Sequence, residues 1–519
     1  MASQLPEIAQ ALLNPSIYPD KPAGVEMMQT QMSFIFLTGK YVYKLRKSVN
    51  LGYLDYTTLE KRRFFSDQEV ELNRRLSPKV YLGVLPVTRG KSGLTLEGSG
   101  ETIDYVVKML NLPQDRMLNV LLDRNRVQPE MLEKVAQIMA EFHSRAATNS
   151  IIRSFGRLVG VKINTDENFS QTLPYIGKVV TQEKFERLKI YHDVFFTQHG
   201  DLFKQRVTDG KIRDCHGDLH AQHICFADTI YIYDCIEFNE RFRYCDVASE
   251  IAFLAMDLDH YGRADLSRAF VNAYISASGD RQIKELLKFY KIYRAHVRGK
   301  VGCFKLDDPY ISETEKKQIL EAARGYFELA DSYAVSRPRL FITVGLVGSG
   351  KSTVSQVLAK RLGLTVLSSD LIRKQLAGIA PTEHRFEELE SGIYSAEFSQ
   401  KTYNKMFSEA ESILKDGDSV IMDATFIKAE ERGKAAALAQ TIGADFFVIE
   451  CHLDEVNTRQ RLAQRLKNTA VSDGRWEVYE PQKRKYEPVT EFPGGVVFSV
   501  DSARNISEQI SGIVSQIAD

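Results

Sequence analysis

The sequence predicts two domains: an α+β domain in residues 1–335, and an α/β domain with a parallel sheet wrapped by helices in residues 336–519. A chain of 519 residues is too long for a single hydrophobic core. β-rich segments precede a long, mainly helical stretch in the first part, whereas apolar β-rich and helical segments alternate in the second. The boundary is predicted at Ser336-Arg337-Pro338-Arg339, where a helical pattern stops at a proline.

The first 112 residues or so predict a small, β-rich lobe. Two strand-like segments, 32–37 and 41–45, flank Thr38-Gly39-Lys40, which is typical of a hairpin. The capping box Thr57-x-x-Glu60 then opens a predicted helix that runs to about Leu76. Further strands are predicted near residues 80–88 and 103–110.

Residues from about 113 to 335 predict a larger, helical lobe. The pattern is mainly helical from residue 130, and short strands interrupt it at 222–227 and 230–234. Its last predicted helix, 313–335, is opened by the capping box Ser312-x-x-Glu315.

The last part of the chain has the rhythm of a parallel sheet with helices between its strands. Each predicted strand is a short apolar segment rich in β-branched or aromatic residues. The predicted strands are 339–345, 365–368, 418–423, 445–451 and 496–500.

Residues 345–353 read Gly-Leu-Val-Gly-Ser-Gly-Lys-Ser-Thr and fit the phosphate-loop pattern GxxxxGKS/T at every fixed position. In such a loop backbone N–H groups surround phosphate oxygens, Lys351 reaches the β- and γ-phosphates, and Ser352 ligates Mg²⁺. A chance glycine turn is the alternative. The strand before the loop and the amphipathic helix after it, which ends at Gly363, favour nucleotide binding. The predicted ATP ligands are Gly345, Gly348, Ser349, Gly350, Lys351, Ser352 and Thr353.

The overall composition indicates no charged polymer as a partner. Lys plus Arg and Asp plus Glu both number 68, so net charge does not point to nucleic acid or an anionic membrane. No run of about 18 apolar residues suggests a membrane span, and the N-terminus lacks the pattern of a secretion signal. With six cysteines, the chain is expected to be cytoplasmic with reduced thiols.

A second constellation lies in the first domain. His216-Gly217-Asp218-Leu219-His220 is a predicted loop, and Asp234 ends an apolar strand shortly after it. Two aspartates that flank a short hairpin suit phosphoryl transfer, since one can accept a hydroxyl proton while the other holds Mg²⁺. A turn with a capped aspartate is the structural alternative.

These residues resemble the aminoglycoside phosphotransferase and choline kinase family, which has a bilobal protein-kinase-like fold. The resemblance covers most of residues 30–330 and implies that Asp218 is the catalytic base and Asp234 a metal ligand. It also suggests Lys44 as the lysine that pairs with the phosphates. Glu69 is the suggested ion-pair partner of this lysine, with Glu71 as the competing residue.

The sequence departs from that family at one metal position. The asparagine expected five residues after Asp218 is His223, and imidazole is a poor ligand for Mg²⁺. His223 is retained as a candidate metal ligand beside Asp234. The departure also leaves open a non-catalytic lobe that only binds nucleotide.

Two further patterns have structural and functional interpretations. Cys215, Cys225, Cys235 and Cys245 recur among histidines, but without a CxxC pair the spacing favours buried thiols over a zinc site. Lys291, Arg294, Arg298 and Lys300 form a basic stripe on a predicted helix. A solvated face is the default expectation for this stripe, and a clamp for an anionic substrate is the alternative.

The second domain carries its own acceptor candidates. Asp370 and Arg373 follow the second predicted strand, and Asp423 ends the third, at the edge where such sheets bind ligands. The Asp-x-x-Arg spacing resembles phosphate-loop kinases of the zeta-toxin, polynucleotide kinase and gluconate kinase group. The resemblance implies Asp370 as base, Arg373 as acceptor clamp and Asp423 as a Mg²⁺ ligand. Helix capping is the alternative for Asp370. The group's lid suggests two further ATP-binding residues, Arg461 and Arg465.

The sequence therefore predicts a two-domain kinase in which both domains use ATP and Mg²⁺ to phosphorylate a hydroxyl acceptor. A small polar metabolite is the expected acceptor. A nucleic-acid 5′-end is the second candidate for the C-terminal domain, and the neutral net charge argues against it. The alternatives from other classes are a nucleotide-gated regulator with an N-terminal pseudokinase lobe and an RNA-associated ATPase.

Overall fold

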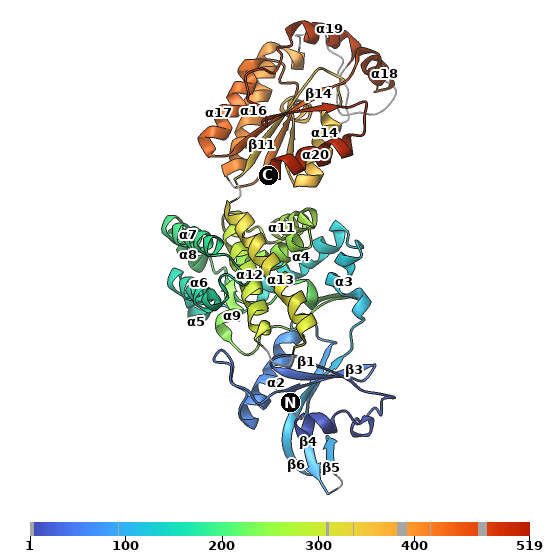
Figure 1. Ribbon diagram of the computed structural model, residues 1–519, viewed down its shortest axis with the longest axis vertical. Coiled ribbons are helices and arrows are strands. Elements are labelled where there is room, and N and C mark those ends of the chain that lie inside the picture. The colour runs from blue at the N-terminus through green and yellow to red at the C-terminus, as the bar shows by residue number, and fades with distance from the viewer. Residues whose placement is uncertain are drawn as a thin grey trace. The chain divides into compact units, whose positions relative to one another are not determined.

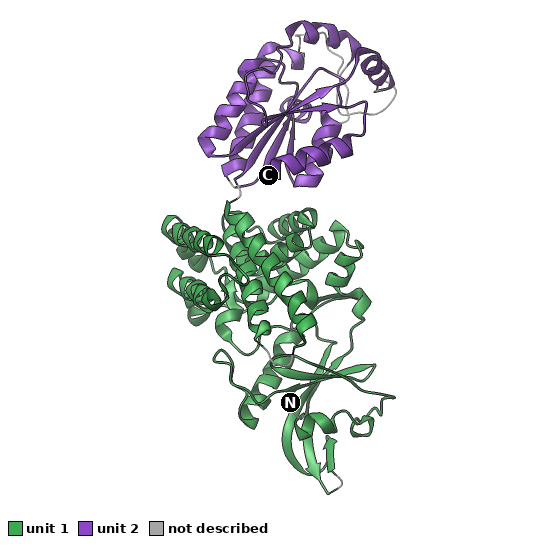
Figure 2. Cartoon of the chain, viewed as in Figure 1, with its two compact units in different colours: residues 1–335 green, residues 336–519 purple. Residues whose placement is uncertain are grey.

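The computed structural model describes residues 5–91, 93–307, 311–335, 337–380, 392–415, 417–465 and 475–518. The chain forms two compact units, Met1–Val335 and Ser336–Asp519 (Figure 2). Among the described residues, every cluster of buried apolar side chains lies within one unit. Each unit therefore has a core of its own.

The N-terminal unit begins with an antiparallel sheet of six described strands in the order β1-β2-β3-β6-β4-β5 (Figure 1). Tyr43 and Leu45 of β3 are buried in an apolar cluster on one face of this sheet. Because side chains alternate along a strand, Lys44 and Arg46 lie on the other face, where both contact α2. The elements are α1 Glu7–Ala11, β1 Glu26–Gln29, β2 Ser33–Leu37, β3 Tyr41–Arg46, α2 Leu59–Arg74, β4 Tyr81–Gly90, β5 Gly93–Leu96 and β6 Glu101–Leu110.

The rest of this unit is mainly helical. Its central helix is α10, in which every residue from Val247 to Leu258 is buried. The helices are α3 Leu118–Asp123, α4 Pro129–Arg145, α5 Ser150–Ser154, α6 Leu158–Thr172, α7 Gln182–Gln198, α8 Gly200–Thr208, α9 Glu240–Arg243, α10 Val247–His260, α11 Ala264–Ser278, α12 Ile283–Leu306 and α13 Glu313–Val335. Two small antiparallel pairs, β7 with β10 and β8 with β9, lie among them. These strands are β7 Ile212–Asp214, β8 Ile224–Phe226, β9 Ile230–Ile232 and β10 Tyr244–Asp246.

The C-terminal unit is an α/β fold around a parallel sheet in the order β12-β13-β11-β14-β15. One apolar cluster packs α16 and α17 against the sheet, and a second packs α14 and α20, so helices cover both faces (Figure 1). The strands are β11 Arg339–Val344, β12 Thr365–Ser368, β13 Val420–Asp423, β14 Asp445–His452 and β15 Val497–Asp501. The helices are α14 Lys351–Leu362, α15 Ser369–Leu376, α16 Ala396–Lys415, α17 Ala429–Ile442, α18 Glu455–Arg465, α19 Trp476–Lys485 and α20 Ile506–Ala518.

Two expectations from the sequence are wrong. The N-cap of α2 is Thr58, whose Oγ1 accepts a hydrogen bond from the Lys61 N–H at 3.2 Å. The backbone N–H and the hydroxyl of Thr57 instead donate hydrogen bonds to Asp55 Oδ1, so Thr58 is the residue that caps the helix. The basic stripe of α12 is not a solvated face, because Arg294 and Lys300 are buried. No described helix is both long and apolar enough to cross a membrane.

Candidate active sites

The loop that carries Asp218 is held by one buried carboxylate. Glu250 of α10 accepts hydrogen bonds from the backbone N–H groups of His216, at 3.1 Å, and Gly217, at 2.5 Å. Its Oε2 also lies 2.7 Å from Nε2 of His143. Burial favours the neutral acid, but His143 and the loop donors lower the pKa of Glu250 to about 2. Glu250 is therefore ionised at neutral pH and anchors the loop.

His216 connects this loop to the end of β9. Its Nε2 lies 2.9 Å from the Tyr233 carbonyl oxygen, so this nitrogen carries the proton, and Nδ1 accepts from the Asp218 N–H at 3.3 Å. Burial lowers the pKa of His216 to about 4, which keeps the ring neutral. On the other side, Arg294 donates to the Gly217 carbonyl at 3.1 Å. The position of Asp218 relative to Asp234 is thus fixed through hydrogen bonds.

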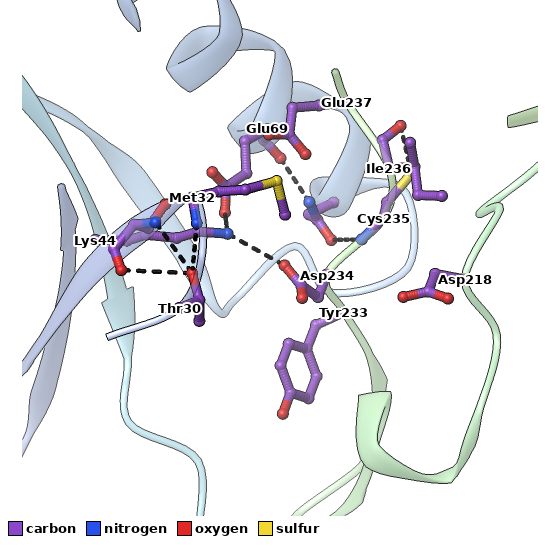
Figure 3. Close-up of polar contacts among 12 residues, drawn as sticks. Thr30, Met32, Lys44, Glu69, Asp218, Tyr233, Asp234, Cys235, Ile236 and Glu237 are labelled. Atoms are coloured by element: carbon purple, nitrogen blue, oxygen red, sulfur yellow. Dashed lines mark hydrogen bonds and ion pairs between the residues drawn. The ribbon is translucent and has the colours of Figure 1, made fainter. Parts of the chain in front are cut away.

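Lys44, Glu69 and Asp234 meet from three separate elements (Figure 3). Nζ of Lys44 lies 2.9 Å from Glu69 Oε1 and 3.2 Å from Asp234 Oδ1. Burial disfavours the charge on Lys44, but the two carboxylates hold its pKa above the ordinary value. Glu71, the competing candidate, is exposed on α2 and accepts from Gln68. The ion pair is made by Glu69.

Asp218 and Asp234 both remain ionised. Burial favours the neutral acid at Asp218, but His220, His223 and Arg298 hold its pKa well below the usual range. Burial acts in the same direction at Asp234, where Lys44 and His223 lower the pKa to about 2. In Figure 3 Asp218 lies beyond Asp234 as seen from Lys44.

His223 lies between these two carboxylates. Its Nδ1 is 3.0 Å from the Asp218 carbonyl oxygen and 3.6 Å from Asp218 Oδ2, and its Nε2 is 3.4 Å from Asp234 Oδ2. The side chain of Asp234 is 42% exposed, so this carboxylate remains accessible to a ligand. Asp218, His220 and His223 form a group whose ligand atoms lie close enough together to hold a metal ion, and Asp234 adjoins this group through its contact with His223.

The phosphate loop of the C-terminal unit joins β11 to α14. Gly345, Gly348 and Gly350 all have positive φ, which glycine adopts without strain. Nζ of Lys351 donates to the Gly345 carbonyl at 3.0 Å and to the Leu346 carbonyl at 2.8 Å, so the ammonium lies inside the loop. Thr353 is in the first turn of α14. Loop amides, helix N-terminus and lysine together form an anion site.

The Ser352 hydroxyl and the carboxylates of Asp370 and Asp423 lie near one another at this loop. Ser368 pairs with Asp423 across β12 and β13, and Asp370 follows in the first turn of α15. Ser352 hydrogen-bonds to Asp423. Burial raises the pKa of Asp423, and Asp370 adds to this increase. A carboxylate that is buried beside a phosphate loop and bonded to the loop serine fits a Mg²⁺ ion.

The arginines near this site point to different places. Arg461 of α18 donates to the Gly348 carbonyl at 3.3 Å and to Ser502 Oγ at 3.1 Å, and so contacts the phosphate loop. The buried guanidinium of Arg373 donates to the Ile393 carbonyl at 2.7 Å and to Ser399 Oγ at 3.2 Å. Arg373 thus connects α15 to the start of α16. Arg465 ends α18, and its side chain lies outside the described part of the structure.

Several residues of these sites were not predicted from the sequence. Glu250 and His143 support the Asp218 loop, and Arg46 lies 2.6 Å from Glu69 and 2.6 Å from Glu237. Their partners are distant in sequence, and no local motif marks them. Charged residues within apolar segments, such as Glu250 in an apolar helix, were the one available signal.

Comparison with known proteins gives the following matches. A family model described as "AAA domain" matches residues 340–489. "Uncharacterized protein Rv2004c" of Mycobacterium tuberculosis is 30% identical over 416 residues, which are 80% of this chain and 81% of that protein. "Uncharacterized protein Mb2027c" of Mycobacterium bovis gives the same figures.

Two solved structures are similar to the C-terminal part. APS kinase CysC of Mycobacterium tuberculosis is 21% identical and covers 35% of this chain and 99% of its own, with a TM-score of 0.26. A gluconokinase of Sinorhizobium meliloti is 18% identical and covers 35% and 94%, with a TM-score of 0.25. At these identities and scores, neither structure indicates the substrate of this chain.

Proposed function

This chain belongs to the family of the mycobacterial proteins Rv2004c and Mb2027c, and we propose that it is a two-domain ATP-dependent phosphotransferase. In this proposal each unit transfers the γ-phosphate of ATP to a hydroxyl group of a separate acceptor. Mg²⁺ supplies charge neutralisation at the phosphates in both.

In the C-terminal unit the phosphate loop supports nucleotide-dependent phosphotransfer. Lys351 binds the β- and γ-phosphates, Ser352 and Asp423 hold Mg²⁺, and Arg461 contacts the phosphates from α18. Asp370 accepts the proton of the acceptor hydroxyl, since it lies at the same edge of the sheet as the loop. Arg373 positions α15, which carries Asp370, through its hydrogen bonds to Ile393 and Ser399.

In the N-terminal unit one observation carries the proposal: Lys44 is in contact with both Glu69 and Asp234. Residues 44 and 234 are far apart in sequence, and this union of lysine, helix glutamate and strand-end aspartate is the phosphate-binding arrangement of protein-kinase-like enzymes. We assign this unit to an aminoglycoside phosphotransferase-like fold. Lys44 binds phosphates, Asp234 holds the metal, and Asp218 accepts the hydroxyl proton.

The low pKa of Asp218 fits this role. A loose phosphoryl-transfer transition state needs little proton abstraction, and catalysis depends mainly on the position of the acceptor hydroxyl. Asp218 stays ionised at neutral pH and can accept a hydrogen bond from that hydroxyl throughout. The acceptor is a small polar metabolite of the cytoplasm in this proposal, and a nucleic-acid 5′-end is the second candidate for the C-terminal unit.

A regulatory role for the N-terminal unit is the competing function. His223 stands where an oxygen ligand for Mg²⁺ is expected and contacts both aspartates. A unit that binds ATP without transferring phosphate, and signals nucleotide state to the other unit, would tolerate this residue. Nucleotide turnover that is insensitive to Asp218 substitution would favour this function.

The test is phosphate transfer from labelled ATP to compounds of a cell extract, followed by identification of the labelled products. Asp218→Asn should abolish one product and Lys351→Ala another. Asp228→Asn, an exposed aspartate in the turn between β8 and β9, is the control and should retain both. A product pattern that all three variants share with wild type would refute the proposal.

A further inference from the structure

His223 faces Asp234 in a way that hydrogen bonding alone does not explain. Its Nδ1 lies 3.0 Å from the Asp218 carbonyl oxygen, and a carbonyl can only accept a hydrogen bond. Nδ1 therefore carries the proton, and in a neutral imidazole the lone pair is on Nε2. That lone pair faces Asp234 Oδ2, another acceptor, at 3.4 Å.

Two facing acceptors at this distance repel each other, and their arrangement is stabilised by a cation. Either a second proton on the ring or a metal ion can supply it. The other oxygen of Asp234, Oδ1, already accepts from Lys44 at 3.2 Å, so Oδ2 is the oxygen left for the cation. The ring of His220 lies 3.9 Å from the ring of His223 and tilts from it by 34°, which restricts the imidazole to this orientation.

The contact at Nδ1 fits a metal ion at Nε2. Metal-binding histidines typically donate their other ring N–H to a carbonyl or carboxylate, which fixes the tautomer and directs the free nitrogen at the metal. His223 makes this contact with the Asp218 carbonyl. The side chain of His223 is 14% exposed and that of Asp234 is 42% exposed, so the pair is open on the Asp234 side.

We infer that His223 Nε2 and Asp234 Oδ2 bind a divalent transition metal together with the ATP phosphates, and that this site selects Mn²⁺-type ions over Mg²⁺. The selection follows from ligand chemistry. Mg²⁺ prefers oxygen ligands, whereas divalent first-row transition metals, of which Mn²⁺ binds least tightly, also accept imidazole nitrogen. The inference rests on the proposed function of the N-terminal unit and concerns only its metal.

The experiment uses the full chain with Lys351→Ala, which weakens nucleotide binding at the phosphate loop. The β,γ-methylene analogue of ATP is titrated calorimetrically with Mn²⁺ or with Mg²⁺, and Mn²⁺ electron spin-echo spectra are recorded for nitrogen coupling. His223→Asn restores an oxygen ligand. His199→Asn, a half-buried histidine at the end of α7, is the matched control.

With His223 present, Mn²⁺ should support binding at least about tenfold more tightly than Mg²⁺, and the spectra should show imidazole nitrogen coupling. His223→Asn should remove the coupling and bring the two affinities to within about twofold of each other. His199→Asn should change neither result.

Nucleotide binding without nitrogen coupling would overturn this inference, mean that the cation is a proton, and leave the kinase proposal standing. An affinity ratio that His223→Asn does not change would also overturn it. Absence of nucleotide binding with either metal would overturn both the inference and the proposed function of the unit.

Discussion

At the scale of single residues, Glu250 is 0% exposed and accepts hydrogen bonds from two consecutive backbone amides of the Asp218 loop. Its partner His143 is itself held by the Tyr274 hydroxyl at 2.8 Å. A buried carboxylate with three donors is stabilised only while all of them are in place, since each donor offsets part of the desolvation cost. One charge therefore holds the two loop amides.

Glu250→Gln should lower the free energy of unfolding of the N-terminal unit by about 3 kcal/mol, because the amide replaces a charged acceptor and presents a donor to the loop N–H groups. Urea unfolding followed by far-ultraviolet circular dichroism measures this change. Glu141→Gln, an exposed residue of α4, is the control and should change stability by less than about 0.5 kcal/mol.

The stability difference between wild type and Glu250→Gln also gives a pH test with a defined sign. The pKa of Glu250 falls from 4.5 to about 2 on folding, so its contribution is full above pH 4.5 and is lost as the pH falls towards 2. The stability difference between wild type and Glu250→Gln should therefore shrink across this window. A difference that stays constant from pH 5 down to about 3 would show that Glu250 is not the linked group.

Asp370→Asn should separate nucleotide binding from chemistry in the C-terminal unit. The substitution keeps the shape of the side chain and removes its basicity, so ATP affinity should change by less than about threefold while acceptor phosphorylation falls at least about 100-fold. The control is Asp445→Asn, at the amino end of β14 and thus at the opposite edge of the sheet. A large loss of ATP affinity would make Asp370 a structural or metal-binding residue.

At the scale of elements, the junction between the phosphate loop and α14 leaves no room for a side chain. Gly350 caps α14 with φ +91°. A Cβ there would lie 2.8 Å from Ser502 Cβ and 2.9 Å from Arg461 Nη1. The loop, α18 and the end of β15 thus converge on one glycine.

Gly350→Ala should weaken ATP binding at least about tenfold, since it combines left-handed strain with a clash against Ser502 and Arg461. Gly443→Ala is a matched control, because Gly443 caps α17 with φ +74° and has no atom within 4 Å of its would-be Cβ. It should lose about 1 kcal/mol of stability and keep its ATP affinity. Calorimetric titration with ATP measures the affinity of both variants. Equal ATP affinities of Gly350→Ala and Gly443→Ala would mean that the phosphate loop tolerates the added side chain.

The elements that sequence predicts well are those with a local signature. All five strands of the C-terminal sheet lie where apolar β-rich segments indicate them, and Gly363 caps the C-terminal end of α14. The short strands β1 and β5 were not predicted, because they are stabilised by pairing with β2 and β4 and not by their own pattern. The N-cap of α2 is Thr58 and not the predicted Thr57, because the Thr57 hydroxyl donates a hydrogen bond to Asp55.

The candidate sites show the same division. The phosphate loop and the two aspartates of the N-terminal unit are visible in sequence, since their chemistry needs fixed spacings. The buried hydrogen bonds of α12 cannot be predicted from the sequence. Arg294, for example, donates to the Gly217 carbonyl, and these two residues are distant in sequence. A helical pattern cannot distinguish a buried arginine with such a partner from a solvated one.

At the scale of the whole molecule, the two units have separate cores. The C-terminal sheet buries one cluster under α16 and α17 and another under α14 and α20, all from residues after 336. Trp476, the only tryptophan of the chain, lies in α19 and stacks on Tyr479 with ring centroids 4.8 Å apart. Tryptophan fluorescence therefore reports on the C-terminal unit alone.

Residues 336–519 should fold and bind ATP as an isolated fragment, because a unit with its own core does not need the other for stability. The midpoint of thermal unfolding, followed by Trp476 fluorescence, should lie within about 4 °C of that in the full chain, which corresponds to roughly 1 kcal/mol. The fragment with Lys351→Ala is the control for binding. Without ATP it should unfold at the same temperature as the unsubstituted fragment, and added ATP should not raise its unfolding temperature. An isolated fragment that lacks a cooperative transition, while the full chain shows one, would mean that the N-terminal unit supplies part of the stability of this fold.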